Sequence, residues 1–428
     1  MPEASDLDWK QDNYSGKDSD KQEFAKDVTG LANGTGGILV IGVKEGTYGC
    51  ESTPVEVSDV TTLRYEQVCR DLVFPYLPGV EVRELAKGNG TGYYVIIVNR
   101  SADAPHAVVT GKDKPSFRYA LRIGTTTRYL HEAEVAARYR DRFISQSQRA
   151  EGLDRVHAAG LERLPSDFPR IAMSLYPAIA GDLGIGSRAV AAVAGFMHSW
   201  MAYTAPPVET FQTHCRVVPG VRRAVFNPDV GMTATVSQPH AQLHFNGAGF
   251  VALATPSREP AMTSDPVARN ADKITQDHLE LQFVAQLMLL SHHAVNTGST
   301  GDCTVRAQLV LATQFEFNGP KPSATVVLLP VRQDDGSGFA HDYDSTTLPV
   351  RRNPAPIEVA ADADELVTDI SAVISTAYAV ACDVLGEFGI GEPCVLKPDG
   401  TLATERVVDP TLRAPIERWA AQSNMHIR

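Results

Sequence analysis

Two groups of charged residues in the first 142 positions have types and spacing that could do chemistry. The first group is acidic: Glu3 stands five residues before Asp8, and Asp8 begins the acid–aromatic–lysine triplet Asp8-Trp9-Lys10. Clustered carboxylates can hold Mg²⁺ or Mn²⁺, which activates a water molecule and neutralises charge on a scissile phosphate. The alternative is that Glu3 and Asp8 are solvated surface acids with Lys10 as a salt-bridge neighbour, a contact worth only ~0–1 kcal/mol.

The second group is basic and lies between residues 112 and 142. Eight basic residues face four acidic ones there, a net charge of +4, and Tyr119, Tyr129 and Tyr139 are interleaved with them. Arginine and lysine contact phosphates, and tyrosine can stack on unpaired bases. A solvated helix face with core tyrosines would give the same pattern. The basic residues are Lys112, Lys114, Arg118, Arg122, Arg128, Arg138, Arg140 and Arg142.

The elements that must position these residues indicate an α+β arrangement. The apolar stripe of Lys21–Asn33 predicts an amphipathic helix, and Asn33-Gly34 ends it because both residues tolerate the left-handed conformation. The unbroken apolar runs Ile38–Ile41 and Tyr93–Val98 predict buried strands, the first covered on both faces. Further elements are expected as helices at Leu63–Phe74 and His131–Phe143 and as strands at Ala107–Val109 and Tyr119–Ile123.

The composition limits the classes of protein to which the chain can belong. Its 428 residues include 39 Lys+Arg and 51 Asp+Glu, a formal charge of −12, which excludes a uniformly basic nucleic-acid coat but allows a local basic patch. The six cysteines form no CxxC pair, which argues against structural zinc and a disulfide framework and suits a reducing cytosol. The first residues lack the apolar core of a signal peptide, and no apolar run reaches the ~20 residues that span a bilayer. We therefore expect a cytoplasmic protein without membrane contact.

Two domains are expected, residues 1–148 and 149–428, with their boundary inside Ser145–Pro165, because a domain usually holds ~100–200 residues. Residues 151–428 hold 20 basic and 30 acidic side chains, so the negative charge belongs mainly to the second part. The second part is expected to be a larger α+β domain that senses or assembles. Its expected elements are helices at Ala189–Tyr203, Gln276–His293 and Asp362–Phe388, β-rich stretches at Val230–Ala254 and Thr304–Val331, and a long loop at Asp334–Pro356.

Four pieces of the N-terminal third occur in an order typical of one family. They are Glu3 with Asp8-Trp9-Lys10, then Val28–Gly37 (VTGLANGTGG), then the strand Ile38–Val43 (ILVIGV), and last Tyr119–Thr127 (YALRIGTTT). In these four pieces the chain resembles Schlafen-type AlbA_2 domains. The resemblance implies a mixed-sheet domain over residues 1–148.

The resemblance also implies a nuclease site. In ribonucleolytic Schlafen proteins, carboxylates from the acidic segment and from the end of the glycine-led strand form a metal-dependent centre. The matching ligands of Mg²⁺ or Mn²⁺ here are Glu3, Asp8 and Glu45, and Lys10 would touch a phosphate. The implied activity is that of an endoribonuclease cleaving structured RNA such as tRNA. GxxxxGK[ST] is absent, so a Walker-type nucleotide site gains no support.

A basic groove for nucleic acid is expected around the second group. Arg118 and Arg122 are an even number of residues apart on one expected strand and would share a face. Arg138 and Arg142 are four apart and would share one side of the following helix. The residues expected to contact nucleic acid are Lys10, Arg118, Arg122, Thr125, Thr126, Arg128, Arg138 and Arg142.

Three functions remain open from the sequence. The chain is expected to be a nucleic-acid-binding regulatory or defence protein, a metal-dependent endoribonuclease, or a self-assembling scaffold protein. Schlafen nuclease cores look like two similar lobes, whereas this chain holds one. Pairing about a twofold axis would rebuild two lobes, so a homodimer or larger homo-oligomer is expected.

Overall fold

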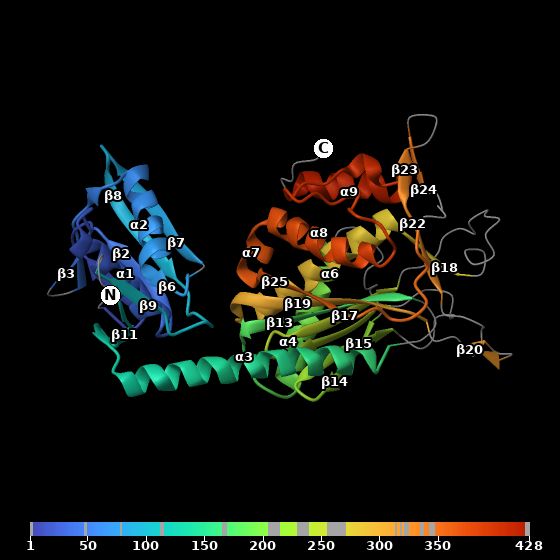
Figure 1. The fold of residues 1–428 in the computed structure, drawn as a ribbon, viewed down its shortest axis with the longest axis horizontal. Helices are drawn as coiled ribbons and strands as arrows, with labels where there is room; N and C mark the ends of the chain where they lie inside the picture. The colour runs from blue at the N-terminus through green and yellow to red at the C-terminus, as the bar shows by residue number, and fades with distance from the viewer. Residues whose placement is uncertain are drawn as a thin grey trace. The chain divides into compact units, whose positions relative to one another are not determined.

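A computed structural model of the chain divides into two compact units, Met1–Gln148 and Arg149–Arg428 (Figure 1). Both units combine helices with sheets, which confirms the expected α+β class. Lys112 and Lys114 of the basic segment lie outside the described residues. The structure describes residues 3–46, 49–77, 79–111, 115–164, 169–203, 215–228, 239–254, 271–312, 315–316, 319–320, 325–333, 338–341 and 347–423.

The N-terminal unit is built on a sheet with the strand order β1-β2-β8-β5, in which β7 also pairs with β8. The β1–β2 pair is parallel and the other pairs are antiparallel. Helices α1 and α2 bury Phe24 and Tyr65 against Tyr94 of the sheet, and the Phe24 and Tyr65 rings stack with centroids 4.6 Å apart. The elements are β1 (Leu7–Lys10), α1 (Asp18–Ala32), β2 (Gly37–Ile41), β3 (Val43–Gly46), β4 (Gly49–Ser52), β5 (Val55–Glu56), α2 (Asp59–Leu72), β6 (Val73–Phe74), β7 (Val80–Gly88), β8 (Thr91–Val98), β9 (Ala107–Thr110), β10 (Ser116–Arg118), β11 (Ala120–Ile123), β12 (Thr126–Tyr129) and the first part of α3 (Glu132–Leu161).

The strand at Ile38–Ile41 is not covered on both faces, so that prediction is wrong. Leu39 and Ile41 are 0% exposed, whereas Ile38 is 38% exposed. Successive side chains of a strand point to opposite faces, and α1 and α2 contribute to a core on one face. An apolar run therefore does not by itself show that a strand is covered twice.

The ends of three helices also differ from the predictions. Asn33 keeps a right-handed conformation (φ −74°), and it is Gly36 and Gly37 that take positive φ values of 78° and 150°. Helix α2 ends at Leu72, because the next two residues pair with β9 as β6. Helix α3 continues to Leu161 instead of ending at Phe143 and crosses the boundary between the units.

The C-terminal unit is built on a seven-stranded antiparallel sheet with the order β14-β15-β16-β17-β13-β19-β25. Its elements are β13 (Arg170–Ile179), α4 (Ser187–Tyr203), β14 (Cys215–Gly220), β15 (Arg223–Pro228), β16 (His240–His244), β17 (Gly249–Ala254), β18 (Asp272–Thr275), α6 (Gln276–Asn296), β19 (Thr300–Val310), β20 (Phe315–Glu316), β21 (Gly319–Pro320), β22 (Val326–Leu329), β23 (Val331–Gln333), β24 (Phe339–His341), β25 (Ile357–Asp362), α7 (Ala363–Thr368), α8 (Ile370–Gly386), a 3₁₀ turn (Thr404–Arg406) and α9 (Pro410–Gln422).

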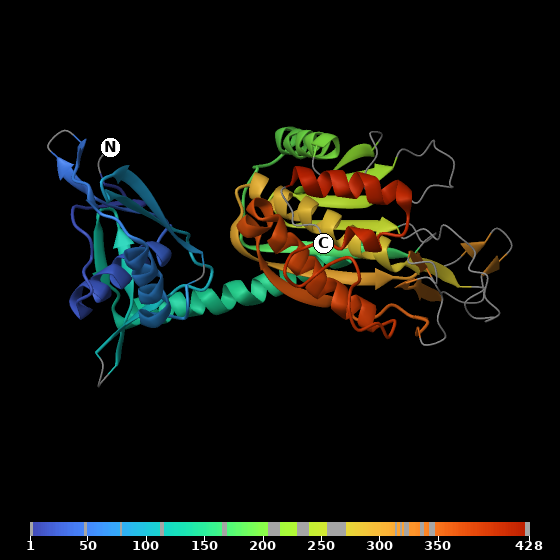
Figure 2. The ribbon, with the colours of Figure 1, turned by 90° about the horizontal axis from the view of Figure 1, so that it is seen from above.

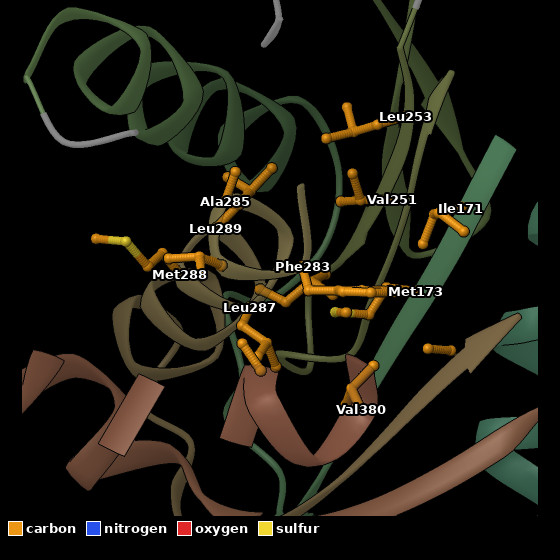
Figure 3. Packing of buried hydrophobic residues seen from close by; sticks show 14 of the residues in the cluster. Ile171, Met173, Val251, Leu253, Phe283, Ala285, Leu287, Met288, Leu289 and Val380 are labelled. Carbon is orange, nitrogen blue, oxygen red and sulfur yellow. The ribbon is translucent and has the colours of Figure 1, made fainter. Parts of the chain in front are cut away.

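Helix α6 forms the centre of this unit. It contacts β13 and β17 on one side and α8 on another (Figures 1 and 2). Phe283 and Leu287 of α6 lie among side chains of the sheet, such as Met173, and of α8, such as Val380 (Figure 3). A helix that is buried nearly all round must satisfy its polar side chains internally. Glu280 does so by accepting hydrogen bonds from three successive backbone N–H groups, those of Cys394, Val395 and Leu396.

The opposite face of this sheet is covered by the second part of α3. Val156 packs there against Ala172 and Phe250. A Cβ atom at Gly160 would lie 2.2 Å from the Phe250 ring, so the helix approaches as closely as a glycine allows.

Helices α4 and α6 confirm the predictions at Ala189–Tyr203 and Gln276–His293, but the single helix expected at Asp362–Phe388 is wrong. Asp369 interrupts it in an extended conformation, and its side chain caps α8 by accepting from Ser371 N at 2.8 Å.

The expected loop at Asp334–Pro356 contains β24, while residues 334–337 and 342–346 lie outside the described part. The β-rich predictions hold for β16, β17, β19 and β22, although residues 229–238 are not described. In the described part of the chain, no helix combines the length and apolarity that crossing a bilayer requires.

Candidate functional site

Asp8 lies at the centre of a partly buried group of charged side chains, called here the ion cluster: Glu3, Asp8, Lys10, Asp27 and Arg122. Asp8 is 3% exposed. Its Oδ1 lies 3.3 Å from Arg122 Nη1, and its Oδ2 lies 3.2 Å from Lys10 Nζ. Each carboxylate oxygen of Asp8 therefore faces a cation.

Lys10 joins Asp8 to a second buried acid, Asp27. Lys10 Nζ lies 3.1 Å from Asp27 Oδ2, and the Tyr14 hydroxyl donates to the same oxygen at 2.7 Å. Asp27 comes from α1 and is 3% exposed. The ion cluster thus connects β1 to α1 through one ammonium group.

Arg122 holds the N-terminal segment by backbone contacts as well as by charge. Its Nε donates to Ala4 O at 3.2 Å, and its Nη2 donates to Leu7 O at 3.0 Å. Glu3 lies 3.9 Å from the same guanidinium, and Glu3 Oε1 accepts from Trp9 N at 3.1 Å. Arg122 therefore works as a clamp on β1 and the residues before it.

The glycine-rich segment between α1 and β2 explains why these side chains meet. At Gly37 a Cβ atom would lie 2.4 Å from Asp6 O, so only glycine lets the residues before β1 approach β2. At Gly30 a Cβ atom would lie 2.8 Å from Thr127 Cγ2, which allows the β11–β12 hairpin to rest on α1. The first contact places Asp8 and the second places Arg122.

The nucleic-acid groove expected around Arg118 and Arg122 needs a correction. The two residues lie on different strands, β10 and β11, which belong to different sheets. Arg122 is 6% exposed and its guanidinium is engaged by β1, whereas Arg118 is exposed. Phosphate contact at Arg122 would require breaking the ion cluster.

Arg118 and the β11–β12 hairpin form one exposed surface. The Arg118 guanidinium lies over the Tyr129 ring, 5.4 Å from its centroid. Thr125 and Thr126 are exposed at the hairpin tip, where Gly124 has a φ of 61°. A glycine with positive φ at the first position of a two-residue loop is typical of a type II′ turn.

The other expected arginine contacts are occupied by the protein itself. Arg128 forms a two-pronged ion pair with Glu134, with one N–O distance of 2.9 Å. Arg138 donates to Asn33 O at 2.8 Å and so satisfies a carbonyl at the end of α1. Arg142 lies 3.3 Å from Asp103. Arg138 and Arg142 are therefore half-buried structural residues in this arrangement.

Residues 3–131 match the family model described as Schlafen, AlbA_2. The N-terminal unit carries an AlbA_2 domain. The match covers about a third of the chain and supports a nucleic-acid-related function in broad terms. No curated protein matches this chain.

The solved structures add little beyond this domain. A crystal structure of the DIP2311 protein from Corynebacterium diphtheriae is 16% identical with a TM-score of 0.22. The alignment covers 47% of this chain and 31% of that chain, so less than a third of that protein is spanned.

Burial and the neighbouring charges shift the pKa values of Asp8, Asp27 and Lys10 in the ion cluster. Burial raises the pKa of Asp8, and the adjacent Glu3 carboxyl adds to this against the opposing charges of Lys10 and Arg122. Burial also raises the pKa of Asp27, despite the Lys10 charge and the hydrogen bond from Tyr14. For Lys10, burial acts to lower the pKa, but Asp27 and Asp8 together outweigh it and raise the pKa above its ordinary value. Lys10 therefore keeps its charge and holds both acids.

The residues present do not fit the three-carboxylate Mg²⁺ or Mn²⁺ site expected from the sequence. Glu3 and Asp8 come together, but both oxygens of Asp8 already face cations. Glu45 is exposed on β3, which pairs with β4 in a separate hairpin. Within the described ranges, no three His, Cys, Asp or Glu side chains gather where they could hold a metal ion.

Asp27 of the ion cluster and Tyr14, which donates to it, were not predicted from the sequence. Asp27 lies three residues after Phe24 and one before Val28, inside the apolar stripe of α1. An acid inside an apolar stripe must find a partner when the helix packs, because burying an unpaired charge is costly. That interruption of the stripe was the available signal.

Proposed function

We propose that the AlbA_2 domain binds nucleic acid through the surface formed by Arg118 and the β11–β12 hairpin. The observation that carries the proposal is the position of Arg118: its guanidinium is exposed and is held over the Tyr129 ring. None of the ion pairs found among the described residues includes Arg118. A cation that is already oriented loses little entropy when it meets a phosphate, and a guanidinium can contact two phosphate oxygens at once.

The tip of the β11–β12 hairpin supplies hydroxyl groups that can contact phosphate beside Arg118. The exposed Thr125 and Thr126 hydroxyls can donate to phosphate oxygens. Such contacts position a nucleic acid without reading its bases, so the proposed binding depends on charge and shape more than on sequence. By its resemblance to Schlafen-type domains, the whole chain would serve regulation or defence in the cytoplasm.

Salt dependence of binding tests this proposal. Anisotropy of a labelled single-stranded RNA is measured at several salt concentrations with the full chain and with Arg118→Ala. Losing one phosphate contact reduces the slope of log K against log salt by about 0.7. Arg83→Ala is the matched control, because Arg83 is also exposed but lies on β7 and pairs with Glu81. Equal affinity and equal slope for the parent and Arg118→Ala would reject the surface.

A second candidate function is endoribonuclease activity on structured RNA such as tRNA. What favours it is the adjacency of Glu3 and Asp8: the Glu3 carboxyl acts in the same direction as burial on the pKa of Asp8, which is raised despite the charges of Lys10 and Arg122. Incubating total RNA with the protein and Mg²⁺ or Mn²⁺, beside Glu3→Gln, tests it. Cleavage by the parent that Glu3→Gln abolishes would support this function, and intact RNA in every sample would exclude it under those conditions.

A further inference from the structure

Exposed apolar side chains are concentrated in the N-terminal unit. Thirteen large hydrophobic residues of the described chain are exposed, and ten of them lie in residues 1–148. Two stand on the outer face of α2: Val60 is 73% exposed and Leu63 is 56% exposed. An uneven distribution of this kind marks an interaction surface more often than scattered single residues do.

These α2 residues line a groove of about 590 Å³. Its lining comes from the start of α1, from the outer face of α2 and from the end of β9, where Val109 lies. The groove and the ion cluster share no residue. It is therefore separate from the charged site of the AlbA_2 domain.

The apolar surface continues from Val109 onto β10 and β6. In the sheet β10-β9-β6, Phe117 lies opposite Val109, and Phe74 lies opposite Ala107. Phe117 and Phe74 are 58% and 47% exposed. Ala107 and Val109 are two residues apart on β9 and so share a face of the sheet. Residues directly opposite each other on neighbouring strands also share a face, so both phenylalanine rings lie on the Val109 side. Val108 points to the other face, into the core.

The charges around the groove indicate the class of partner. Asp18 and Asp71 line it together with Lys21 and Arg64, two acids and two bases. A balanced rim gives no net attraction for a phosphate backbone, which argues against nucleic acid here. A rim with equal numbers of acids and bases suits pairing with a second copy of the same surface. A twofold axis places the same patch on both sides and can set each acid against a base.

We propose that this groove, with Phe74 and Phe117, is the surface through which a second copy of this chain binds. Thirteen residues line the groove, and the two phenylalanines bring the surface to fifteen, somewhat fewer than the ~20–30 per partner of a standard interface. Arg118 is the neighbour of Phe117 on β10 and projects from the other face, so pairing leaves the proposed nucleic-acid surface accessible.

Sedimentation of the full chain at several micromolar concentrations tests the proposal. The parent is expected to sediment as a reversible dimer. Leu63→Arg places a charge in the lining of the groove and should raise the dissociation constant about 30-fold, the effect of losing one strong interface residue. Val60→Arg changes a side chain that is 73% exposed and so carries little risk to folding, and it should act in the same direction.

Leu85→Arg is the control, because Leu85 is 53% exposed on β7 and lies outside the groove. It should dimerise like the parent, with circular dichroism confirming that all variants fold. A monomeric parent, an unchanged dimer in both Leu63→Arg and Val60→Arg, or equal weakening in Leu85→Arg would overturn the proposal. Loss of RNA binding without loss of the dimer in Leu63→Arg would also overturn it, because the groove would then hold nucleic acid.

Discussion

The side chain of Asn33 and the backbone of His106 form a reciprocal pair of hydrogen bonds. Asn33 Nδ2 donates to His106 O at 2.8 Å, and His106 N donates to Asn33 Oδ1 at 2.7 Å. The same Nδ2 donates to Ala120 O at 2.8 Å. One buried amide thus joins the end of α1 to the residue before β9 and to the first residue of β11, the strand that carries Arg122.

Replacing Asn33 by Ala should destabilise the N-terminal unit by about 3 kcal/mol. The substitution removes three buried hydrogen bonds, each worth about 1 kcal/mol, and leaves His106 N without its acceptor. Urea unfolding followed by circular dichroism measures the loss. Asn13→Ala is the control, because the half-buried Asn13 side chain makes two hydrogen bonds instead of three, and the one that it donates to Glu56 O is exposed to solvent. Similar losses for the two variants would contradict the role given to Asn33.

Asp8→Ala should destabilise the AlbA_2 domain far more than Glu3→Gln does. Removing Asp8 leaves the buried Arg122 and one side of Lys10 without their carboxylate, and breaking a buried ion pair costs ~3–5 kcal/mol. Glu3→Gln keeps an acceptor for Trp9 N and loses only the 3.9 Å contact with Arg122, for which we expect under ~1 kcal/mol. Chemical denaturation of both variants makes the comparison. Equal losses would mean that Asp8 is not held by its two cations.

Gly37→Ala should detach β1 from β2. The new Cβ would lie 2.4 Å from Asp6 O at a backbone φ of 150°, so we expect a loss of about 3 kcal/mol or more. Gly16→Ala is the matched control, since nothing lies within 4 Å of its Cβ position and its φ is not positive. It should be neutral or stabilise by up to ~1 kcal/mol. If Gly37→Ala unfolds at the same urea concentration as the parent, β1 does not need this close approach.

The C-terminal unit should lose stability as the pH falls from 6.5 towards 4. Burial lowers the pKa of His240 and His293 to about 4 and that of His244 to about 3. In the unfolded chain these imidazoles take up protons below pH 6.5, whereas in the folded unit they stay neutral. The contribution of these histidines to the free energy of unfolding is therefore fully present above pH 6.5. Below that pH it falls by up to ~1.4 kcal/mol per pH unit for each histidine. Thermal unfolding at a series of pH values measures the slope.

The N-terminal unit offers an internal comparison for that experiment. The raised pKa values of Asp8 and Asp27 mean that protonating these carboxyls in acid favours the folded state. Replacing His293 by Gln should flatten the acid slope of the C-terminal unit alone. A melting temperature of that unit that does not change between neutral pH and pH 4.5 would contradict the prediction.

The sequence predicted the elements better than it predicted which charges are accessible. The AlbA_2 resemblance, the α+β class and the helices α4 and α6 follow from local patterns, because apolar periodicity and glycine spacing act over a few residues. The burial of Arg122 does not, because it depends on contacts with Ala4 and Leu7, which lie more than 110 residues earlier in the chain. Tyr119 lies between β10 and β11 and belongs to neither strand, so Arg118 and Arg122 are on different strands. The even spacing of the two arginines in the sequence gives no sign of this break.

The metal prediction shows the same limit. Glu3 and Asp8 lie side by side because Glu3 accepts from Trp9 N, the residue after Asp8 on β1. Their spacing in the sequence could not show that Arg122 and Lys10 would occupy the oxygens of Asp8, or that Glu45 would stand on a separate hairpin. Asp27 lies 17 residues after Lys10 in the chain, so only the packing of α1 beside β1 brings the two side chains together.

The position of Trp9 gives the ion cluster an optical reporter. Trp9 stands between Asp8 and Lys10 on β1, and the chain's other two tryptophans, Trp200 and Trp419, belong to the C-terminal unit. With Trp200 and Trp419 replaced by Phe, the indole emission comes from β1 alone. Release of β1 from Arg122 would move that indole towards water and shift its emission to longer wavelength, so the opening of this strand can be followed in real time, separately from the unfolding of the rest of the protein.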